Sequence, residues 1–194
     1  MRSVAIYCGS SDKIGGEFLS AAREIGRRVA HRGLQLVYGA GKTGLMGAVA
    51  DGALEVGGEV IGIMPEIFDT PQLAHQGLTR YEVVPDIPTR KGRMAELADG
   101  YIALPGGFGT FEELFEMLTW SQIGLHHKPV GLLNAEGYFN TLIQFLMEVE
   151  QKGFTYKVHN QLFHSDADPD KLLDWMMAYT RPAGLEKWVE RDVD

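Results

Sequence analysis

Residues 34–64 read LQLVYGAGKTGLMGAVADGALEVGGEVIGIM, and two kinds of pattern alternate within this stretch. Leu34 to Tyr38 and Val60 to Met64 are short apolar runs, which are typical of buried strands. Between them, Leu45, Val49 and Val56 recur at helical spacing after a glycine-rich turn. A strand, a helix and a second strand within about thirty residues predict a parallel β–α–β unit.

The same alternation of apolar runs and helical periods extends over most of the chain. The strands read as continuous apolar runs, which is the pattern of a parallel sheet covered on both faces. We therefore predict an α/β fold, a Rossmann-like doubly wound parallel sheet in a single domain at 1–180, with a polar, loosely held tail at 181–194. The other predicted strands are 4–8, 81–84, 101–104 and 130–133, and helices are predicted near 18–29, 89–98, 111–118, 138–152 and 171–179. Asp168 is the expected N-cap of the last helix, with Pro169 at its first position.

Composition and charge limit the classes of protein to which the chain can belong. Its 194 residues can bury one core, and its net charge of −8 argues against a general nucleic-acid binder, which needs a broad basic surface. The single cysteine, Cys8, lies in an apolar run and allows neither an internal disulfide nor a cysteine zinc site. The six histidines show no ligand pairing, and no apolar run has membrane-spanning length. We expect a soluble cytoplasmic protein that needs no metal ion or other cofactor.

Three loops follow predicted strands and are candidate ligand sites, because ligands of such sheets bind at the carboxyl ends of the strands. These loops are 9–11, which contains Ser10, then 39–44 and 105–110. The 39–44 loop matches G-x-G-x-x-G, but it follows the second strand, and the third strand has no acidic residue at its tip. A P-loop would need glycine where Leu36 stands. Direct ligand contact, at Gly41 for example, and a tight turn between strand and helix remain equally good interpretations.

The strongest single motif is Pro105-Gly106-Gly107-Phe108-Gly109-Thr110, at the predicted start of a helix. Glycines leave the backbone free to curl, and the N–H groups at a helix start favour an anion such as a phosphate. Thr110 and Glu113 also form a capping box, in which Glu113 would only return a hydrogen bond to the backbone. Helical spacing places Glu113 opposite the apolar stripe at 111, 114, 115 and 118, so that it need not face the sheet. Taken alone, this motif favours the capping role for Glu113.

Arg90, Lys91 and Met94 form a third group, because spacings of three and four put both cations beside Met94 on one face of a short predicted helix. Two adjacent cations are typical of a solvated helix face. Since this helix precedes the strand that leads into the 105–110 loop, the two cations could instead reach the same site.

Taken together, Arg90-Lys91-x-x-Met94 and Pro105-Gly106-Gly107-x-Gly109-Thr110-x-x-Glu113 resemble the LONELY GUY (LOG) family. The similarity runs from about residue 3 to residue 180 and includes Tyr7-Cys8-Gly9-Ser10-Ser11, Gly44-Leu45-Met46-Gly47-Ala48 and Leu118-Thr119-Trp120. Either motif alone is weak, but their paired spacing over the whole chain is specific. Members of this family are phosphoribohydrolases that act on cytokinin riboside 5′-monophosphates and often on AMP.

The resemblance implies a hydrolase that releases the free base and ribose 5-phosphate from an adenine or N6-modified adenine nucleoside 5′-monophosphate. It places the catalytic pair on Arg90 and Glu113, with Glu113 acting on the attacking water or the cationic sugar and Arg90 fixing the nucleotide. It also implies dimers with sites near the subunit interface, so we expect a homodimer or a larger homo-oligomer, with neither nucleic acid nor membrane as a partner. The expected substrate contacts are Ser10, Gly41, Gln72, Lys91, Met94, Gly106, Gly107, Phe108, Gly109, Thr110, Phe111, Glu112 and Thr119.

Two departures from the family pattern concern base specificity. Ile87 and Pro88 stand where members commonly carry Met-His, and Gln72 stands where many have a glutamate that contacts the substrate. Some relatives carry an older lysine decarboxylase label, which we reject because the chain shows no independent sign of a pyridoxal phosphate site.

Two rival hypotheses remain. The first is a carrier of nucleotide or molybdenum cofactor with the same fold, which would bind its ligand without turnover. The second is a DNA-binding Rossmann protein, which the net charge of −8 disfavours.

Overall fold

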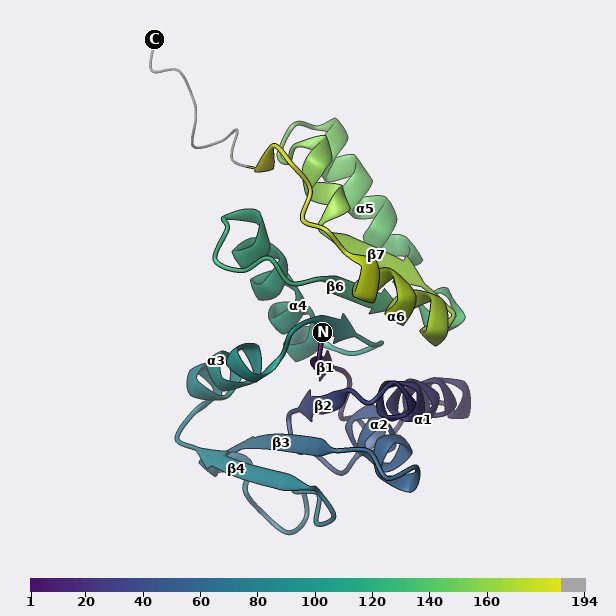
Figure 1. Ribbon diagram of the computed structural model, residues 1–194, viewed down its shortest axis with the longest axis vertical. Helices are drawn as coiled ribbons and strands as arrows, with labels where there is room; N and C mark the ends of the chain where they lie inside the picture. Colours follow the sequence, from purple (N-terminus) through teal and green to yellow (C-terminus); the bar gives the residue numbers. More distant parts are fainter. Residues whose placement is uncertain (186–194) are drawn as a thin grey trace.

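The computed structural model describes residues 1–185, and within them seven strands form one parallel sheet in the order β4-β3-β2-β1-β5-β6-β7 (Figure 1). The strands are β1 (Ser3–Tyr7), β2 (Gln35–Tyr38), β3 (Val60–Pro65), β4 (Arg80–Val84), β5 (Tyr101–Ala103), β6 (Val130–Leu133) and β7 (Phe163–Asp166). The α-helices are α1 (Gly16–His31), α2 (Gly44–Glu55), α3 (Ile87–Leu97), α4 (Phe108–Gln122), α5 (Asn140–Gln151) and α6 (Pro169–Ala178). Three short 3₁₀ helices are η1 (Glu66–Phe68), η2 (Ala135–Gly137) and η3 (Lys157–Gln161).

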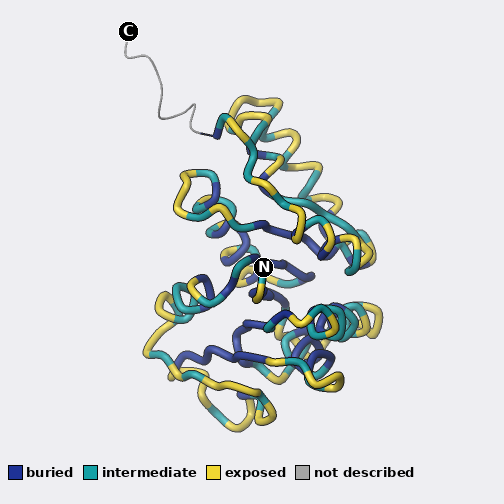
Figure 2. Tube along the Cα trace, in the orientation of Figure 1, coloured by how far each residue is buried: buried dark blue, intermediate teal, exposed yellow. Residues whose placement is uncertain are grey.

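Apolar side chains from helices cover both faces of the sheet. One cluster of buried residues joins Ile6 of β1 to Ile25 of α1, Leu45 of α2 and Leu172 of α6. A second cluster, on the other face, packs Met94 of α3 and Leu114 of α4 against the strands. The buried residues follow the strands through the middle of the molecule (Figure 2). The predicted doubly wound α/β fold is therefore confirmed.

The strand order reverses at β1, and this reversal places the ligand site. The chain leaves β1 towards β2, β3 and β4 on one side, and returns to add β5, β6 and β7 on the other. Ile6 of β1 is in register with Tyr38 of β2, and Tyr7 is in register with Ala103 of β5. The loops that follow these three strands therefore meet at the carboxyl ends of the strands, where such folds bind ligands.

The six strands predicted from apolar runs are all present, with ends within a residue or two of the prediction. β7 was not predicted, because its sequence, Phe-His-Ser-Asp, is mostly polar and the strand lies at the edge of the sheet. The capping of the last helix is confirmed, since the Asp168 side chain accepts hydrogen bonds from the N–H groups of Asp170 and Lys171.

The predicted tail at 181–194 is described only as far as Leu185, whose side chain is buried, and positions 186–194 lie outside the described residues. The domain boundary at 180 remains a prediction. Within residues 1–185, none of the helices has the length and apolar character that crossing a bilayer requires.

Helices α1 and α2 approach each other so closely that side chains would not fit at the contact. A Cβ atom at Gly52 would overlap the carbonyl oxygen of Arg23 and lie 2.8 Å from its carbonyl carbon. A Cβ atom at Gly26 would overlap the carbonyl oxygen of Val49 in the same way. Because these neighbours are backbone atoms of a helix, they cannot rotate away as a flexible side chain would.

We expect Gly52→Ala to lower the free energy of unfolding by about 1–3 kcal/mol, since the added methyl group must push α1 away from α2. Gly92→Ala in α3 is the control, because a Cβ atom there would meet nothing within 4 Å. That control should be neutral or stabilising by about 0.5–1 kcal/mol, as usual for glycine within a helix. Urea unfolding of the two variants measures both values, and an unchanged midpoint for Gly52→Ala would contradict the close approach.

Candidate functional site

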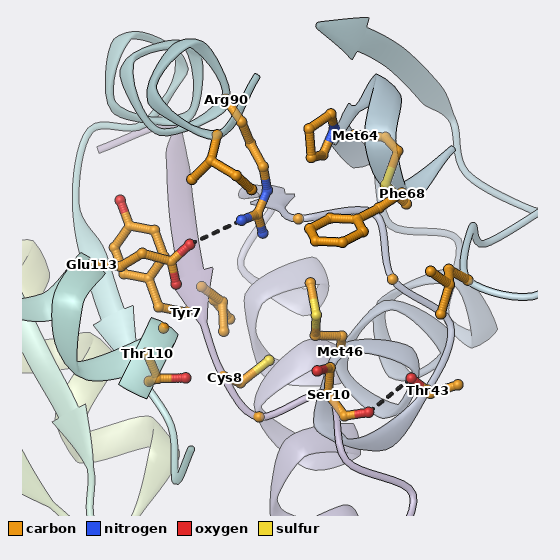
Figure 3. Close-up of a pocket in the computed structure, with 18 of the residues that line it drawn as sticks. Tyr7, Cys8, Ser10, Thr43, Met46, Met64, Phe68, Arg90, Thr110 and Glu113 are labelled. Carbon is orange, nitrogen blue, oxygen red and sulfur yellow. Dashed lines mark hydrogen bonds and ion pairs between the residues drawn. The ribbon is translucent and has the colours of Figure 1, made fainter. Parts of the chain in front are cut away.

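A cavity of about 480 Å³ lies at the carboxyl ends of β1, β2 and β3 (Figure 3). Arg90, Glu113 and Thr110 line one side of it, and Met64 and Phe68 face them from the other side. Ser10 and Thr43 lie at its base, where the Thr43 hydroxyl donates a hydrogen bond to the Ser10 carbonyl at 2.8 Å. The remaining lining residues are Ile6, Tyr7, Cys8, Gly9, Gly39, Gly41, Met46, Pro65, Leu73, Ile87, Gly109 and Glu112.

Arg90 and Glu113 form an ion pair inside this cavity, with 3.1 Å between Nη1 and Oε1. Only 13% of the Arg90 side chain and 10% of the Glu113 side chain are exposed. Arg90 also donates from Nε to the carbonyl oxygen of Ile63 at 3.2 Å, which fixes the guanidinium relative to β3. The start of α3 sets this position, because Asp86 caps the helix by accepting from the Thr89 N–H at 2.7 Å.

The capping box predicted from Thr110 and Glu113 is wrong. Helix α4 begins at Phe108 with Gly107 as its N-cap, so Thr110 already lies within the first turn. The buried face of α4 consists of Thr110, Glu113, Leu114, Met117 and Ser121, whereas 38% of Phe115 is exposed. The helix is thus rotated from the predicted apolar stripe, and Glu113 points into the cavity. Its burial is possible because Arg90 supplies the opposite charge and a hydrogen bond.

The buried carboxyl group of Glu113 has an unusual proton affinity. Burial raises the pKa of Glu113 to about 7, against the opposing effect of the Arg90 cation. The neighbouring charge of Glu112 raises it further, and Lys91 lowers it. Burial also raises the pKa of the adjacent Tyr7 and Cys8 side chains, so both stay neutral. Near neutral pH the site therefore holds a carboxyl group that can gain or lose a proton.

The glycine loop before α4 presents backbone donors beside this ion pair. The first hydrogen bond of the helix runs from the Phe111 N–H to the Gly107 carbonyl at 3.1 Å, so the three preceding N–H groups lie ahead of it. Gly107 and Gly109 have open space around them, and Gly106 leaves room for the side chain of Thr110. Such a helix start, with its positive dipole end, can hold an anionic group.

Some of the predicted substrate contacts meet in the cavity. Ser10, Gly41, Gly109, Thr110 and Glu112 line it together with the predicted catalytic pair. Gly106 and Gly107 belong to the adjoining loop, and Phe108, which is 96% exposed, lies at the surface of the helix start.

The other predicted contacts do not line this cavity. Met94 is fully buried in the core beneath α3, and Phe111 stacks on Tyr138. Thr119 donates its hydroxyl to the Phe115 carbonyl at 2.7 Å, further along α4. Gln72 is exposed, although its neighbour Leu73 is a lining residue.

Lys91 also lies outside the cavity lining, where it bridges α3 and α4 by pairing with Glu112 and with Glu116. Burial disfavours its charged form, but hydrogen bonds to these two carboxylates outweigh that effect and raise the pKa of Lys91. Each acidic residue near the helix start thus has its own cation, with Lys91 beside Glu112 and Arg90 beside Glu113.

The apolar part of the cavity was not predicted as part of the site. Met46, Met64 and Phe68 come from α2, β3 and η1, and no local motif connects them. The position of Met64 and Cys8 at the carboxyl end of a strand could have indicated both, and Cys8 also stands in the Tyr7–Ser11 stretch of the family resemblance. In the 39–44 loop the close turn is confirmed at Gly44, with a φ of +59° against the backbone of Ser10 and Ser11. Gly39 and Gly41 line the cavity, and direct ligand contact there stays a prediction.

Comparisons with known proteins agree on one group of relatives. A family profile described as "Possible lysine decarboxylase" matches residues 46–176, more than half of the chain. A cytokinin riboside 5′-monophosphate phosphoribohydrolase of Rhodococcoides fascians is 47% identical over 154 residues, which cover 79% of this chain and 78% of the relative. A probable cytokinin riboside 5′-monophosphate phosphoribohydrolase of Oryza sativa subsp. japonica is 38% identical over 178 residues, which cover 92% and 84% of the two chains.

Solved structures share the fold. The molybdenum cofactor (Moco) carrier protein of Chlamydomonas reinhardtii superposes with a TM-score of 0.69 over 91% of this chain and 97% of the carrier. Its sequence identity is 23%, so the similarity concerns the arrangement of helices and strands.

Proposed function

We propose that this chain, which belongs to the LONELY GUY family, hydrolyses the N-glycosidic bond of an adenine or N6-modified adenine nucleoside 5′-monophosphate. The products are the free base and ribose 5-phosphate. The observation that carries the proposal is the buried pair of Arg90 and Glu113, 3.1 Å apart in a cavity bordered by a glycine-rich helix start. The relatives of Rhodococcoides fascians and Oryza sativa are described as cytokinin riboside 5′-monophosphate phosphoribohydrolases, which supports the same reaction.

Cleavage of a ribosyl–purine bond builds positive charge on the sugar while electrons move onto the base. In this proposal ionised Glu113 stabilises that charge and accepts a proton from the attacking water. The water oxygen bonds to C1′ as the C1′–N9 bond breaks, the departing base takes up a proton from solvent, and Glu113 then returns its proton to solvent. Arg90 holds the nucleotide and stabilises the developing negative charge.

The 5′-phosphate is assigned to the start of α4. The backbone N–H groups of Phe108, Gly109 and Thr110 supply donors there, and the helix dipole favours an anion. Glu112 would repel the phosphate if its charge were unbalanced, but Lys91 pairs with it. The purine is assigned to the opposite side of the cavity, against Met64 and Phe68.

A panel of substrates tests this function against the carrier hypothesis. The purified chain is incubated with AMP, N6-isopentenyl-AMP, GMP and adenosine, and released base is separated by chromatography. We expect base from the adenine monophosphates and much less from adenosine, which lacks the phosphate. Tight AMP binding without any free adenine would favour the carrier hypothesis. A filter-binding assay with single-stranded DNA tests the hypothesis of a DNA-binding protein.

The pH dependence of kcat/KM follows from the proposed role of ionised Glu113. We expect kcat/KM for AMP to rise with pH and level off above about 7, because burial raises the pKa of Glu113 to about 7. The phosphate of AMP also titrates near pH 6, so Glu113→Gln serves as the control. Any pH dependence of kcat/KM that remains in Glu113→Gln belongs to the ionisation of the substrate. An identical pH profile in the wild type and in Glu113→Gln would contradict the role of Glu113.

We further propose that the chain forms a homodimer in the cytoplasm. Large apolar side chains on or directly after α4 and α5 are exposed, among them Leu125, Phe145, Met147 and Phe154. Helix α5 has no buried residue, which is unusual for a helix that covers a sheet. Sedimentation equilibrium measures the assembly directly, and a mass of one chain at micromolar concentration would contradict the proposed homodimer.

The single, buried cysteine Cys8 is consistent with a reducing compartment such as the cytoplasm.

A further inference from the structure

We propose that Gly39 is a positioning residue for this reaction: its lack of a side chain creates the space in which the Arg90 guanidinium lies beside Glu113. The inference rests on the proposed function. A Cβ atom at Gly39 would overlap Arg90 Nη2 and lie 2.6 Å from Arg90 Cζ. The same atom would lie 2.6 Å from Cε of Met46, the other side chain at this point of the cavity.

Three contacts together define where the guanidinium can lie. Its Nε donates to the Ile63 carbonyl at 3.2 Å, and its Nη1 donates to Glu113 at 3.1 Å. Neither bond uses Nη2, and this nitrogen lies against Gly39. A side chain at position 39 would occupy the place of Nη2 and force the planar group to tilt or withdraw from Glu113. Figure 3 shows the guanidinium extending between the carboxylate and the apolar side of the cavity.

The backbone of Gly39 cannot retreat to make room for a side chain. Tyr38, just before it, is in register with Ile6 on one side and Gly62 on the other. Just after it, the Ala40 carbonyl accepts from the His75 N–H at 2.9 Å.

Ala40 shows how firmly the loop is held. It is fully buried with a φ of +59°, a left-handed conformation that is unfavourable for an L-residue. Such a conformation persists only where the surroundings fix it. Lys42 adds to the constraint by donating its N–H to the Leu73 carbonyl at 2.9 Å. A methyl group at Gly39 would therefore displace the flexible ends of Arg90 and Met46, and leave the backbone in place.

We expect Gly39→Ala to fold normally and to lower kcat for AMP by about a hundred-fold, because a misplacement of about 1 Å in a reacting group has an effect of that size. Gly100→Ala is the matched control. A Cβ atom there would also press on side chains, 2.8 Å from Met1 Sδ, 3.0 Å from Met176 Cε and 3.1 Å from Pro129 Cγ, but at the opposite end of the sheet. This control should keep wild-type kcat.

A double-mutant cycle separates positioning from a general structural effect. In the Arg90→Ala background no guanidinium remains to be displaced, so adding Gly39→Ala should cause no further loss of kcat/KM. A Gly39→Ala loss that multiplies with that of Arg90→Ala would overturn the proposal. So would wild-type kcat in Gly39→Ala alone.

A second measurement needs no turnover, and it distinguishes failure of this inference from failure of the proposed function. The Glu113 side-chain carbon is titrated by NMR in the wild type, in Gly39→Ala and in Gly41→Ala. Arg90 lowers the pKa of Glu113, so its withdrawal in Gly39→Ala should raise that pKa. In Gly41→Ala it should stay unchanged, because the atoms nearest to a Cβ atom there belong to Met46.

The other groups around Glu113 are Glu112, Glu116 and Lys91 on the helices and Tyr7 and Cys8 at the end of β1, and all of them are present in each variant. They are therefore common to all three titrations. An unchanged pKa in Gly39→Ala would overturn the positioning role even if the wild type hydrolyses AMP. A raised Glu113 pKa in Gly39→Ala, together with a wild type that releases no base, would support the positioning and refute the proposed function.

Discussion

Glu113→Gln is expected to lower kcat for AMP by about a hundred- to ten-thousand-fold while the chain stays folded, as usual for loss of a general acid or base. Glutamine has the same shape and can still accept the hydrogen bond from Arg90 Nη1 through its amide oxygen. It cannot take a proton from water or carry the negative charge that balances the cationic sugar. The substitution also removes a buried carboxyl group that burial disfavours in its charged form.

Single-turnover release of adenine, measured beside urea unfolding, checks this expectation. The control is Glu96→Gln on α3, which removes a carboxylate paired with Arg93 at 3.0 Å outside the cavity. It should keep the wild-type rate. Near-normal turnover in Glu113→Gln would remove this residue from the mechanism.

Arg90→Ala should lower kcat/KM by about a hundred- to a thousand-fold, which is the usual effect of losing a donor that stabilises transition-state charge. Two causes act together in this variant. The nucleotide loses the cation that holds it, and Glu113 loses the partner that lowers its pKa. Because the pKa of Glu113 then rises further, more of this side chain is protonated at neutral pH and inactive as a base. Part of the activity should therefore return at higher pH.

The measurement is the pH profile of kcat/KM for Arg90→Ala between neutral and alkaline pH, with Arg93→Ala as the control. Arg93 lies on the same helix but pairs with Glu82 and Glu96, away from the cavity. A rate loss of the same size in both variants would indicate a general effect of charge. A profile in Arg90→Ala that stays flat above neutral pH would separate Arg90 from the ionisation of Glu113.

Local patterns in the sequence were sufficient to predict the sheet. Residues 4–8 and 60–64 are continuous apolar runs. A central parallel strand that is covered by helices on both faces must be built almost entirely from apolar residues, so such runs predict it well. β7 was not predicted, because an edge strand can be polar and Phe163–Asp166 contains only one large apolar residue.

The site could be predicted only in part, because its key contact joins two helices. The capping box was wrong because helical spacing within 108–122 does not reveal which face is buried when a charged residue has a distant partner. Glu113 is buried through Arg90, 23 positions earlier in the chain. Met46, Met64 and Phe68 meet only in the folded chain. Met46 stands in the Gly44–Ala48 stretch of the family resemblance, but no motif joins it to the other two. Arg90 and Glu113 themselves were predicted from the family resemblance, and the spatial contact between them comes from the structure.

A crystal structure of Glu113→Gln with AMP bound tests the central claim most directly. The predicted result has phosphate oxygens on the N–H groups of positions 108–110, C1′ between Arg90 and the glutamine, and adenine against Met64 and Phe68. AMP bound elsewhere, or in this cavity with its sugar out of reach of both position 90 and position 113, would contradict the assignment of the catalytic pair.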